Sequence, residues 1–282
     1  MRDLSQLMGI TIPADESYSK MTEEEKVKHF VDVDNCRQGN LNKDGFDCKF
    51  CRNKGWIAVV QKGPTYITQA TKLCGCLEVR KMIKNAKASG MGDLLDHKLE
   101  NFETTEEWQK TVFQLANEYL ESKGDSWFAV LGQSGAGKTM ICSAIANKLL
   151  KRYKKVKFMT WTEFTEKLKR MRFDADRDEY FEEFSKVEVL YIDDFLKGSI
   201  TTDENGRLKA NATDVKYAFH LINERYNKRL VTIISSEYLI DDIREYVDEA
   251  VAGRINERCR EFCLQIRKDK NKNYRFKQGV VL

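Results

Sequence analysis

The chain has 282 residues, of which 41% are hydrophobic and 33% are charged. This balance is typical of a packed globular protein with a highly charged surface and excludes an intrinsically disordered chain. The 48 basic and 44 acidic residues leave a net charge of +4, so overall charge alone does not indicate a nucleic-acid partner. No stretch approaches the roughly 18 apolar residues of a membrane helix, and no secretory core is present, so we expect a cytoplasmic protein without a membrane partner.

The chain is longer than a single hydrophobic core usually supports, so we expect a small unit followed by a larger one. We place an N-terminal helical segment at residues 1–35, a zinc-binding module with a basic linker helix at 36–91, and the main domain at 92–282. The last boundary follows the Ser-Gly-Met-Gly run at 89–92, because two glycines so close together rarely lie inside a helix.

The first 91 residues predict a helix, a hairpin-rich module and a second helix. Residues 22–33 suit a helix that begins at a capping box formed by Thr22 and Glu25. Residues 36–76 are rich in Gly, Asn and Asp and contain short aromatic or β-branched runs, a composition that favours hairpins. Residues 77–88 predict a basic helix.

Four of the eight cysteines form two close pairs, and in a reducing compartment this pattern indicates a metal site rather than disulfides. The pairs are Cys48-x-x-Cys51 and Cys74-x-Cys76. Four thiolates suit tetrahedral Zn²⁺ and leave no open position, so the ion would be structural. His29 and Cys36 are spare candidate ligands, and free buried thiols are the alternative.

From residue 108 onward, helical and apolar tracts alternate, which predicts an α/β domain with a parallel sheet. The predicted helices are 108–121, 138–153, 162–171, 176–184 and 214–227, and the predicted strands are 127–131, 156–160, 187–192 and 231–235. We find no internal repeat.

A phosphate-binding motif follows the strand at 127–131. Its residues are Gly132, Gln133, Ser134, Gly135, Ala136, Gly137, Lys138 and Thr139, which match G-x-x-x-x-G-K-[ST] in full, and Met140 continues into the helix. In such a loop the backbone N–H groups surround the phosphates of ATP, with the helix N-terminus beneath them. Lys138 would reach the β- and γ-phosphates, and Thr139 would bind Mg²⁺.

A second motif completes the prediction of a magnesium-dependent P-loop ATPase. The strand at 187–192 ends in Asp193 and Asp194, the arrangement of a Walker B motif. Ligands of open parallel sheets sit at the carboxyl ends of the strands, so both carboxylates would face the phosphates. Asp193 would hold Mg²⁺ through water, and Asp194 would orient or deprotonate the attacking water.

Two basic and aromatic regions are candidate contacts for single-stranded DNA. The better one combines Lys167, Lys169, Arg170 and Phe173, which set cations and an aromatic ring on one helical region. The other combines Trp56 and Tyr66 with the basic run after Cys76. A solvated charged face and a small aromatic core are the respective alternatives.

Several tracts together resemble AAA+ helicase loaders of the DnaC/DnaI type. They are the P-loop with the helix that follows it, Lys-Leu-Glu-Asn-Phe at 98–102, Gly-Arg-Ile-Asn-Glu-Arg at 253–258, and the paired-cysteine module before them. The resemblance implies that the first module grips a replicative hexameric DNA helicase. It also implies that the AAA+ domain binds ATP and single-stranded DNA, as a homo-oligomer on the helicase.

The resemblance also implies roles for residues that the motifs alone do not assign. Ser236 takes the position of sensor 1, with Glu237 where an Asn is typical. Arg258 resembles the arginine finger, with Arg254 one helical turn earlier as the other candidate. Arg275 resembles sensor 2. On this basis the catalytic residues are Lys138, Asp194 and Arg258.

Two other functions fit parts of the sequence. An IstB-like transposition ATPase shares the AAA+ core and DNA binding but serves a transposase, and the cysteine module favours the loader instead. A nonenzymatic zinc adaptor with a structural nucleotide is the third, and the Asp193 and Asp194 pair argues against it.

Overall fold

The computed structural model describes residues 18, 20–88, 91–122, 124–202, 204 and 208–276. Contacts between Cα atoms divide the chain into two compact units, Met1–Arg80 and Lys81–Leu282. Helix α4 (Cys76–Ala88) begins in the first unit and continues into the second. Residues 89 and 90 of the predicted break lie outside the described residues. No helix in the described ranges is both long and apolar enough to span a bilayer.

The first unit consists of a helix packed on a hairpin. Its elements are α3 (Glu23–Cys36), η1 (Leu41–Asp44), β1 (Trp56–Lys62) and β2 (Ile67–Leu73). Thr22 and Glu25 form the predicted capping box at the start of α3. The side chain of Asn35 exchanges two hydrogen bonds of 2.9 Å with the backbone of Ala58, which fixes α3 against β1.

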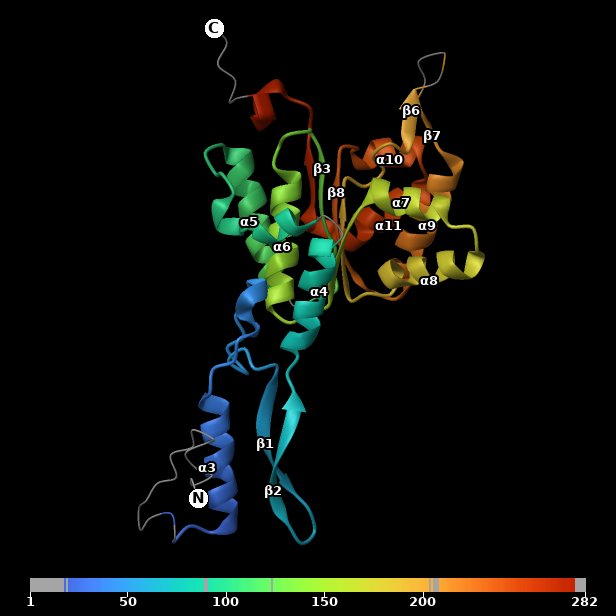
Figure 1. The fold of residues 1–282 in the computed structure, drawn as a ribbon. Helices are drawn as coiled ribbons and strands as arrows, with labels where there is room; N and C mark the ends of the chain where they lie inside the picture. Colours follow the sequence, from blue (N-terminus) through green and yellow to red (C-terminus); the bar gives the residue numbers. More distant parts are fainter. Residues whose placement is uncertain are drawn as a thin grey trace. The chain divides into compact units, whose positions relative to one another are not determined.

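The second unit contains the remaining elements (Figure 1). Its helices are α5 (Glu107–Glu121), α6 (Lys138–Lys151), α7 (Trp161–Arg170), α8 (Asp174–Ser185), α9 (Ala212–Asn227), α10 (Ile240–Tyr246) and α11 (Glu249–Cys259). Its strands are β3 (Phe128–Gly132), β4 (Val156–Thr160), β5 (Val189–Asp193), β6 (Ile200–Thr202), β7 (Leu208–Ala210), β8 (Val231–Ser236) and β9 (Cys263–Ile266). The 3-10 turns are η2 (Gly92–Asp96), η3 (Leu99–Asn101), η4 (Arg260–Phe262), η5 (Lys270–Lys272) and η6 (Tyr274–Phe276).

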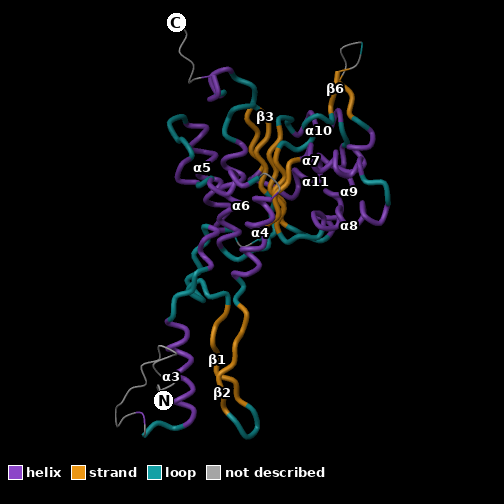
Figure 2. The backbone as a smooth tube through the Cα atoms, viewed as in Figure 1, coloured by secondary structure: helices purple, strands orange, loops and turns teal. Residues whose placement is uncertain are grey.

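Five strands form a parallel sheet in the order β4-β5-β8-β3-β9, which confirms the predicted α/β fold (Figure 2). The small antiparallel pair β6-β7 and the edge strand β9 were not predicted from the sequence. Because β3 and β5 both flank β8, the carboxyl ends of these three strands lie side by side. The P-loop, the two aspartates and Glu237 therefore follow neighbouring strands.

Helices cover both faces of the sheet. Helices α5 and α6 lie on one face, and α7 to α11 lie on the other (Figure 1). The second face buries a large apolar cluster, in which Trp127, Leu131 and Ile192 of the sheet region pack with Leu221 of α9 and Ile255 of α11. Successive strand residues point to opposite faces, so Tyr191, Asp193 and Ser235 belong to the face that α6 covers.

One buried arginine links α9 to the sheet. Arg225 is fully buried, and its guanidinium donates to the carbonyls of Phe184 and Val187 at 2.9 Å each. It also donates to the Thr232 hydroxyl at 2.9 Å and to the carbonyl of Val231. Its fixed fork of donors thus joins the end of α8 to the start of β8.

Candidate nucleotide site and cysteine cluster

The P-loop adopts a backbone that glycine permits. Gly132, Gly135 and Gly137 have φ angles of +100°, +72° and +78°, in the region that other residues rarely adopt. A Cβ atom on Gly132 would lie 2.2 Å from the carbonyl oxygen of Ile266, and one on Gly135 would lie 2.0 Å from Oδ1 of Asn273. Conformation therefore favours glycine at all three positions, and the close approach of the Ile266 backbone also requires it at Gly132.

Lys138, the first residue of α6, is folded into the loop. Its Nζ donates to the carbonyls of Gly132 at 2.9 Å and Gln133 at 2.8 Å. Burial lowers the pKa of Lys138, and the negative charges of Glu237 and Asp194 oppose that shift. Carbonyl oxygens hold the ammonium group here, and phosphate oxygens of a nucleotide would be stronger acceptors for it.

Asp193 lies beside the start of α6, as Walker B geometry requires. The Thr139 hydroxyl donates to its Oδ1 at 2.9 Å. Sequence reasoning missed two more donors to the same oxygen, the hydroxyls of Tyr191 at 2.6 Å and Ser235 at 2.5 Å. The signal available was the strand period, which places Tyr191 on the same face as Asp193.

Asp194 begins the turn after β5. Its φ is +52°, and its backbone N–H donates to the Ser235 hydroxyl at 3.0 Å. Its Oδ2 accepts a 2.7 Å bond from Lys197, which raises the pKa of that lysine. The second carboxylate is therefore paired within its own turn.

A cavity of about 590 Å³ joins most of the predicted nucleotide residues. The P-loop from Ser134 to Met140 lines it together with Asp193, Asp194, Glu237 and Arg275. The upstream Phe102 and the later Tyr274 also line it. The backbone N–H of Tyr274 donates to the Gly135 carbonyl at 3.0 Å, which fixes the C-terminal segment on the loop.

Five predicted residues lie outside this lining: Gly132 and Gln133, which line a neighbouring cavity, and Ser236, Arg254 and Arg258. The buried Ser236 hydroxyl donates to the carbonyl of Phe195 at 2.7 Å, so the neighbouring Glu237, and not Ser236, lines the cavity. Arg258 donates to Oδ2 of Asp125 at 3.1 Å and to its carbonyl, and the Arg258 side chain is 12% exposed. The guanidinium of Arg254 lies over the rings of Phe219 and Tyr226.

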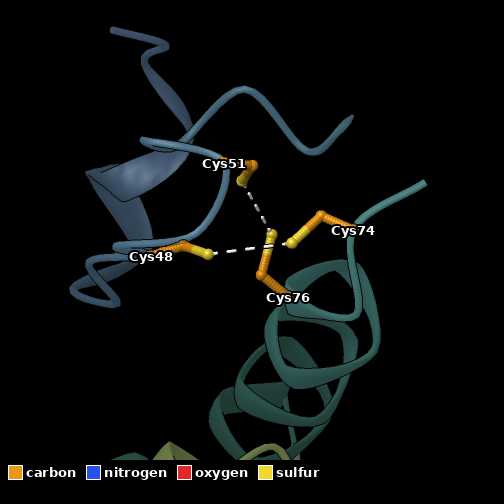
Figure 3. A group of neighbouring side chains, drawn as sticks. All are labelled: Cys48, Cys51, Cys74 and Cys76. Carbon is orange, nitrogen blue, oxygen red and sulfur yellow. Dashed lines mark hydrogen bonds between the residues drawn. The ribbon is translucent and has the colours of Figure 1, made fainter. Parts of the chain in front are cut away.

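The four paired cysteines converge in the first unit (Figure 3). All four are buried, and their Sγ atoms lie within 4.8 Å of one another. The Sγ atoms of Cys48 and Cys74 are 3.8 Å apart, and those of Cys51 and Cys76 are 3.5 Å apart. Cys36 is exposed and does not belong to this group.

These distances suit a tetrahedral zinc ion. A Zn–S bond of about 2.3 Å implies an edge of about 3.8 Å between sulfurs, close to the separations within both pairs. Neighbouring groups also brace the thiols, because Gly55 N–H donates to Cys51 Sγ at 3.3 Å and Cys48 N–H donates to Asn53 Oδ1 at 2.8 Å. Burial raises the pKa of Cys74 and Cys76, a shift that a bound cation would reverse.

The candidate DNA segment is partly engaged within the chain. Lys169 pairs with the buried Asp214 at 2.6 Å, and Lys167 lies over the Tyr180 ring at 4.1 Å. Arg170 has a side chain that is 79% exposed and pairs with Glu166 on its own helix, while Phe173 is 70% exposed. Arg170 and Phe173 are therefore the members of this set that solvent reaches most freely.

A parallel five-stranded sheet with a P-loop after β3 and carboxylates after β5 defines a P-loop ATPase fold of the AAA+ type. The family model described as "IstB-like ATP binding protein" matches residues 76–280. The chain therefore belongs to the IstB-like ATP-binding protein family.

Two relatives come from Bacillus subtilis strain 168. The uncharacterized protein YqaM is 31% identical over 226 residues, covering 77% of this chain and 70% of YqaM. The phage-like element PBSX protein XkdC is 27% identical over 234 residues, covering 79% and 83% of the two chains.

A solved structure of a helicase loader shares the fold. The crystal structure of the DnaC helicase loader is 16% identical with a TM-score of 0.50, over 63% of this chain and 99% of that chain. The chain also matches 52% of the length of a DNA replication initiation factor, at 21% identity and a TM-score of 0.49.

Proposed function

We propose that this protein is an ATP-hydrolysing loader that binds a replicative hexameric DNA helicase and delivers it onto single-stranded DNA. The observation that carries the proposal is the pairing of two features in one chain. A family-matched ATP-binding domain at 76–280 is preceded by a module built around four buried cysteines.

The cavity residues support ATP hydrolysis in named roles. Lys138 would bind the β- and γ-phosphates, while Thr139 and Asp193 would hold Mg²⁺. Mg²⁺, when bound, would neutralise charge on the phosphate oxygens. Asp194 would orient the attacking water once its ion pair with Lys197 is broken. Arg275, which lines the cavity, would contact phosphate. Glu237, which lines the cavity, would take the sensor 1 role in place of Ser236.

The first unit is the proposed helicase contact. Its cysteine cluster would hold a structural Zn²⁺, and two large apolar side chains beside the cluster residues, Phe50 and Leu73, are 72% and 75% exposed. Exposed apolar side chains of this size on a small module are our basis for proposing a protein partner here.

Assembly would place Arg258 against a nucleotide bound by a neighbouring copy. The residue lies outside the cavity of its own chain, which is the arrangement that a finger acting in trans requires. Single-stranded DNA would meet the surface that includes Arg170 and Phe173, through phosphate pairing and base stacking.

An IstB-like transposition ATPase is the second candidate, and the family description is compatible with it without favouring it over the loader. Such a protein would couple the same ATP site to a transposase. The two candidates differ in partner, so a partner assay separates them where an ATPase assay does not. Absence of ATP turnover would instead support a zinc adaptor with a structural nucleotide.

The decisive experiment combines turnover with delivery. Purified protein is mixed with a candidate hexameric helicase, and helicase bound to circular single-stranded DNA is counted with and without ATP. We expect stable copurification, DNA-stimulated ATP turnover and more helicase on the DNA. A protein that hydrolyses ATP but binds a transposase and not a helicase would refute the loader and leave the ATPase intact.

A further inference from the structure

The carboxylate of Asp193 is held by two side chains to which the proposed hydrolysis assigns no role. The Tyr191 hydroxyl donates to Oδ1 at 2.6 Å, and the Ser235 hydroxyl donates to the same oxygen at 2.5 Å. Thr139 donates to it as well, at 2.9 Å. Three hydroxyl donors on Oδ1 leave the other carboxylate oxygen for a different partner.

The fold places these groups together from two strands. Tyr191 and Asp193 are two residues apart in β5, so both point to the face covered by α6. Strand β8 runs parallel to β5 with Ile192 opposite Ile234, which brings Ser235 level with Asp193. The hydroxyl of Ser235 also accepts the backbone N–H of Asp194 at 3.0 Å. One serine therefore fixes both carboxylate residues of the motif.

The phenol of Tyr191 has little freedom to move. The side chain is fully buried, and its ring packs edge-on against Phe158 with centroids 6.0 Å apart. A rigid ring carries its hydroxyl to one place, so the bond to Asp193 fixes the carboxylate rather than following it. A phenylalanine would fill the same space without the donor.

We propose that Tyr191 and Ser235 are positioning residues that orient the Asp193 carboxylate for Mg²⁺. This role rests on the proposed ATPase function. Mg²⁺ demands near-ideal octahedral geometry, so a carboxylate free to rotate would bind it less well. The Thr139 hydroxyl could bind Mg²⁺ through an oxygen lone pair while its hydrogen still donates to Oδ1. Tyr191 and Ser235 are the two donors to this oxygen that have no metal to bind, and they keep the carboxylate in place.

The experiment measures binding rather than turnover. Full-length protein is titrated with a fluorescent ATP analogue in EDTA and at a series of Mg²⁺ concentrations. Mg²⁺ should strengthen binding of the analogue to the wild type. Tyr191→Phe and Ser235→Ala should each raise the Mg²⁺ concentration that gives half of this effect by about 10-fold, the typical effect of losing an outer-shell partner. Binding in EDTA should be unchanged.

Two variants control for loss of structure. Tyr180→Phe makes the same chemical change on the other face of the sheet and should match the wild type. Ser235→Thr keeps a hydroxyl and should recover most of the Mg²⁺ response. Thermal unfolding of each variant is recorded alongside.

The outcomes separate this role from the proposed function. If the affinity of the wild-type protein for the ATP analogue does not change with Mg²⁺ concentration, the proposed function is overturned, and this role with it. A normal wild type with an unchanged Mg²⁺ response in Tyr191→Phe and Ser235→Ala would overturn the positioning role alone. An equal loss of binding in EDTA and in Mg²⁺ would also overturn it, because the side chains would then be structural.

Discussion

Replacing one cysteine of the cluster should unfold the first unit and leave the second unit able to bind nucleotide. Among the described residues of the first unit, eight apolar side chains are buried, and four of them are Cys48, Cys51, Cys74 and Cys76. The other four are Val31, Phe46, Ala58 and Val79. The cluster is therefore half of the unit's core.

The magnitudes show why the metal should decide folding. Burial of a large apolar side chain contributes about 1.5–3 kcal/mol, so the four remaining side chains together contribute roughly 6 kcal/mol. A structural zinc ion bound by small modules contributes about 10–16 kcal/mol of apparent binding free energy. Without the ion, the unit lacks the zinc-binding free energy, which is larger than the contribution of apolar burial. Cys51→Ser should accordingly lower zinc content to near zero and abolish the fold of this unit.

The assay pairs metal analysis with limited proteolysis of freshly purified, reduced protein. The wild type should contain one zinc ion per chain, and Cys51→Ser or a strong chelator should expose the first unit to trypsin. Cys36→Ser is the matched control, because Cys36 is exposed and outside the cluster. ATP-analogue binding should persist throughout. Zinc-free wild type with a protease-resistant first unit would show the reasoning to be wrong.

Three further predictions concern the second unit. Lys138→Ala should abolish ATP turnover without changing thermal unfolding, while Asp194→Asn should bind ATP and hydrolyse it slowly; wild-type turnover in either variant would contradict the assigned role. Arg258→Ala should be inactive alone but regain activity when mixed with Lys138→Ala, since each supplies what the other lacks; no rescue in subunits shown to exchange would exclude a finger in trans. Arg225→Met should lower the free energy of unfolding in urea by at least about 1–3 kcal/mol, because it leaves buried acceptors unpaired. Arg229→Met, at a side chain that is 79% exposed, should cost little, and similar losses in both would refute this account.

The sequence alone was enough to predict the helices and strands that have a clear apolar periodicity. The predicted strand at 231–235 became β8 (Val231–Ser236), and the helix at 214–227 became α9 (Ala212–Asn227). Apolar periodicity and flanking turn residues indicate such elements, because this local pattern is the same whichever neighbouring layer the element packs against. The short pair β6-β7 was missed because its three-residue strands carry no periodic pattern.

Side-chain partners across strands could not be predicted in the same way. The bond between Ser235 and Asp193 depends on β8 lying next to β5, an order that the sequence does not state. Arg225 on a helix would ordinarily be expected at the surface, yet it is buried because acceptors from α8 and β8 converge on it. Tertiary neighbours, and not residue type, set both outcomes.

Two charged groups proposed for hydrolysis are paired within the chain, and the pairs differ in strength. Asp194 and Lys197 have side chains that are 30% and 50% exposed, so their ion pair contributes only about 0–1 kcal/mol. A triphosphate with several negative charges can compete for Lys197 at little cost. Arg258 is 12% exposed and donates to both the side chain and the backbone of Asp125, so its release costs more. In the proposed mechanism, nucleotide binding is therefore sufficient to release Asp194 from Lys197. Releasing Arg258 from Asp125 requires the contacts that a neighbouring subunit would supply.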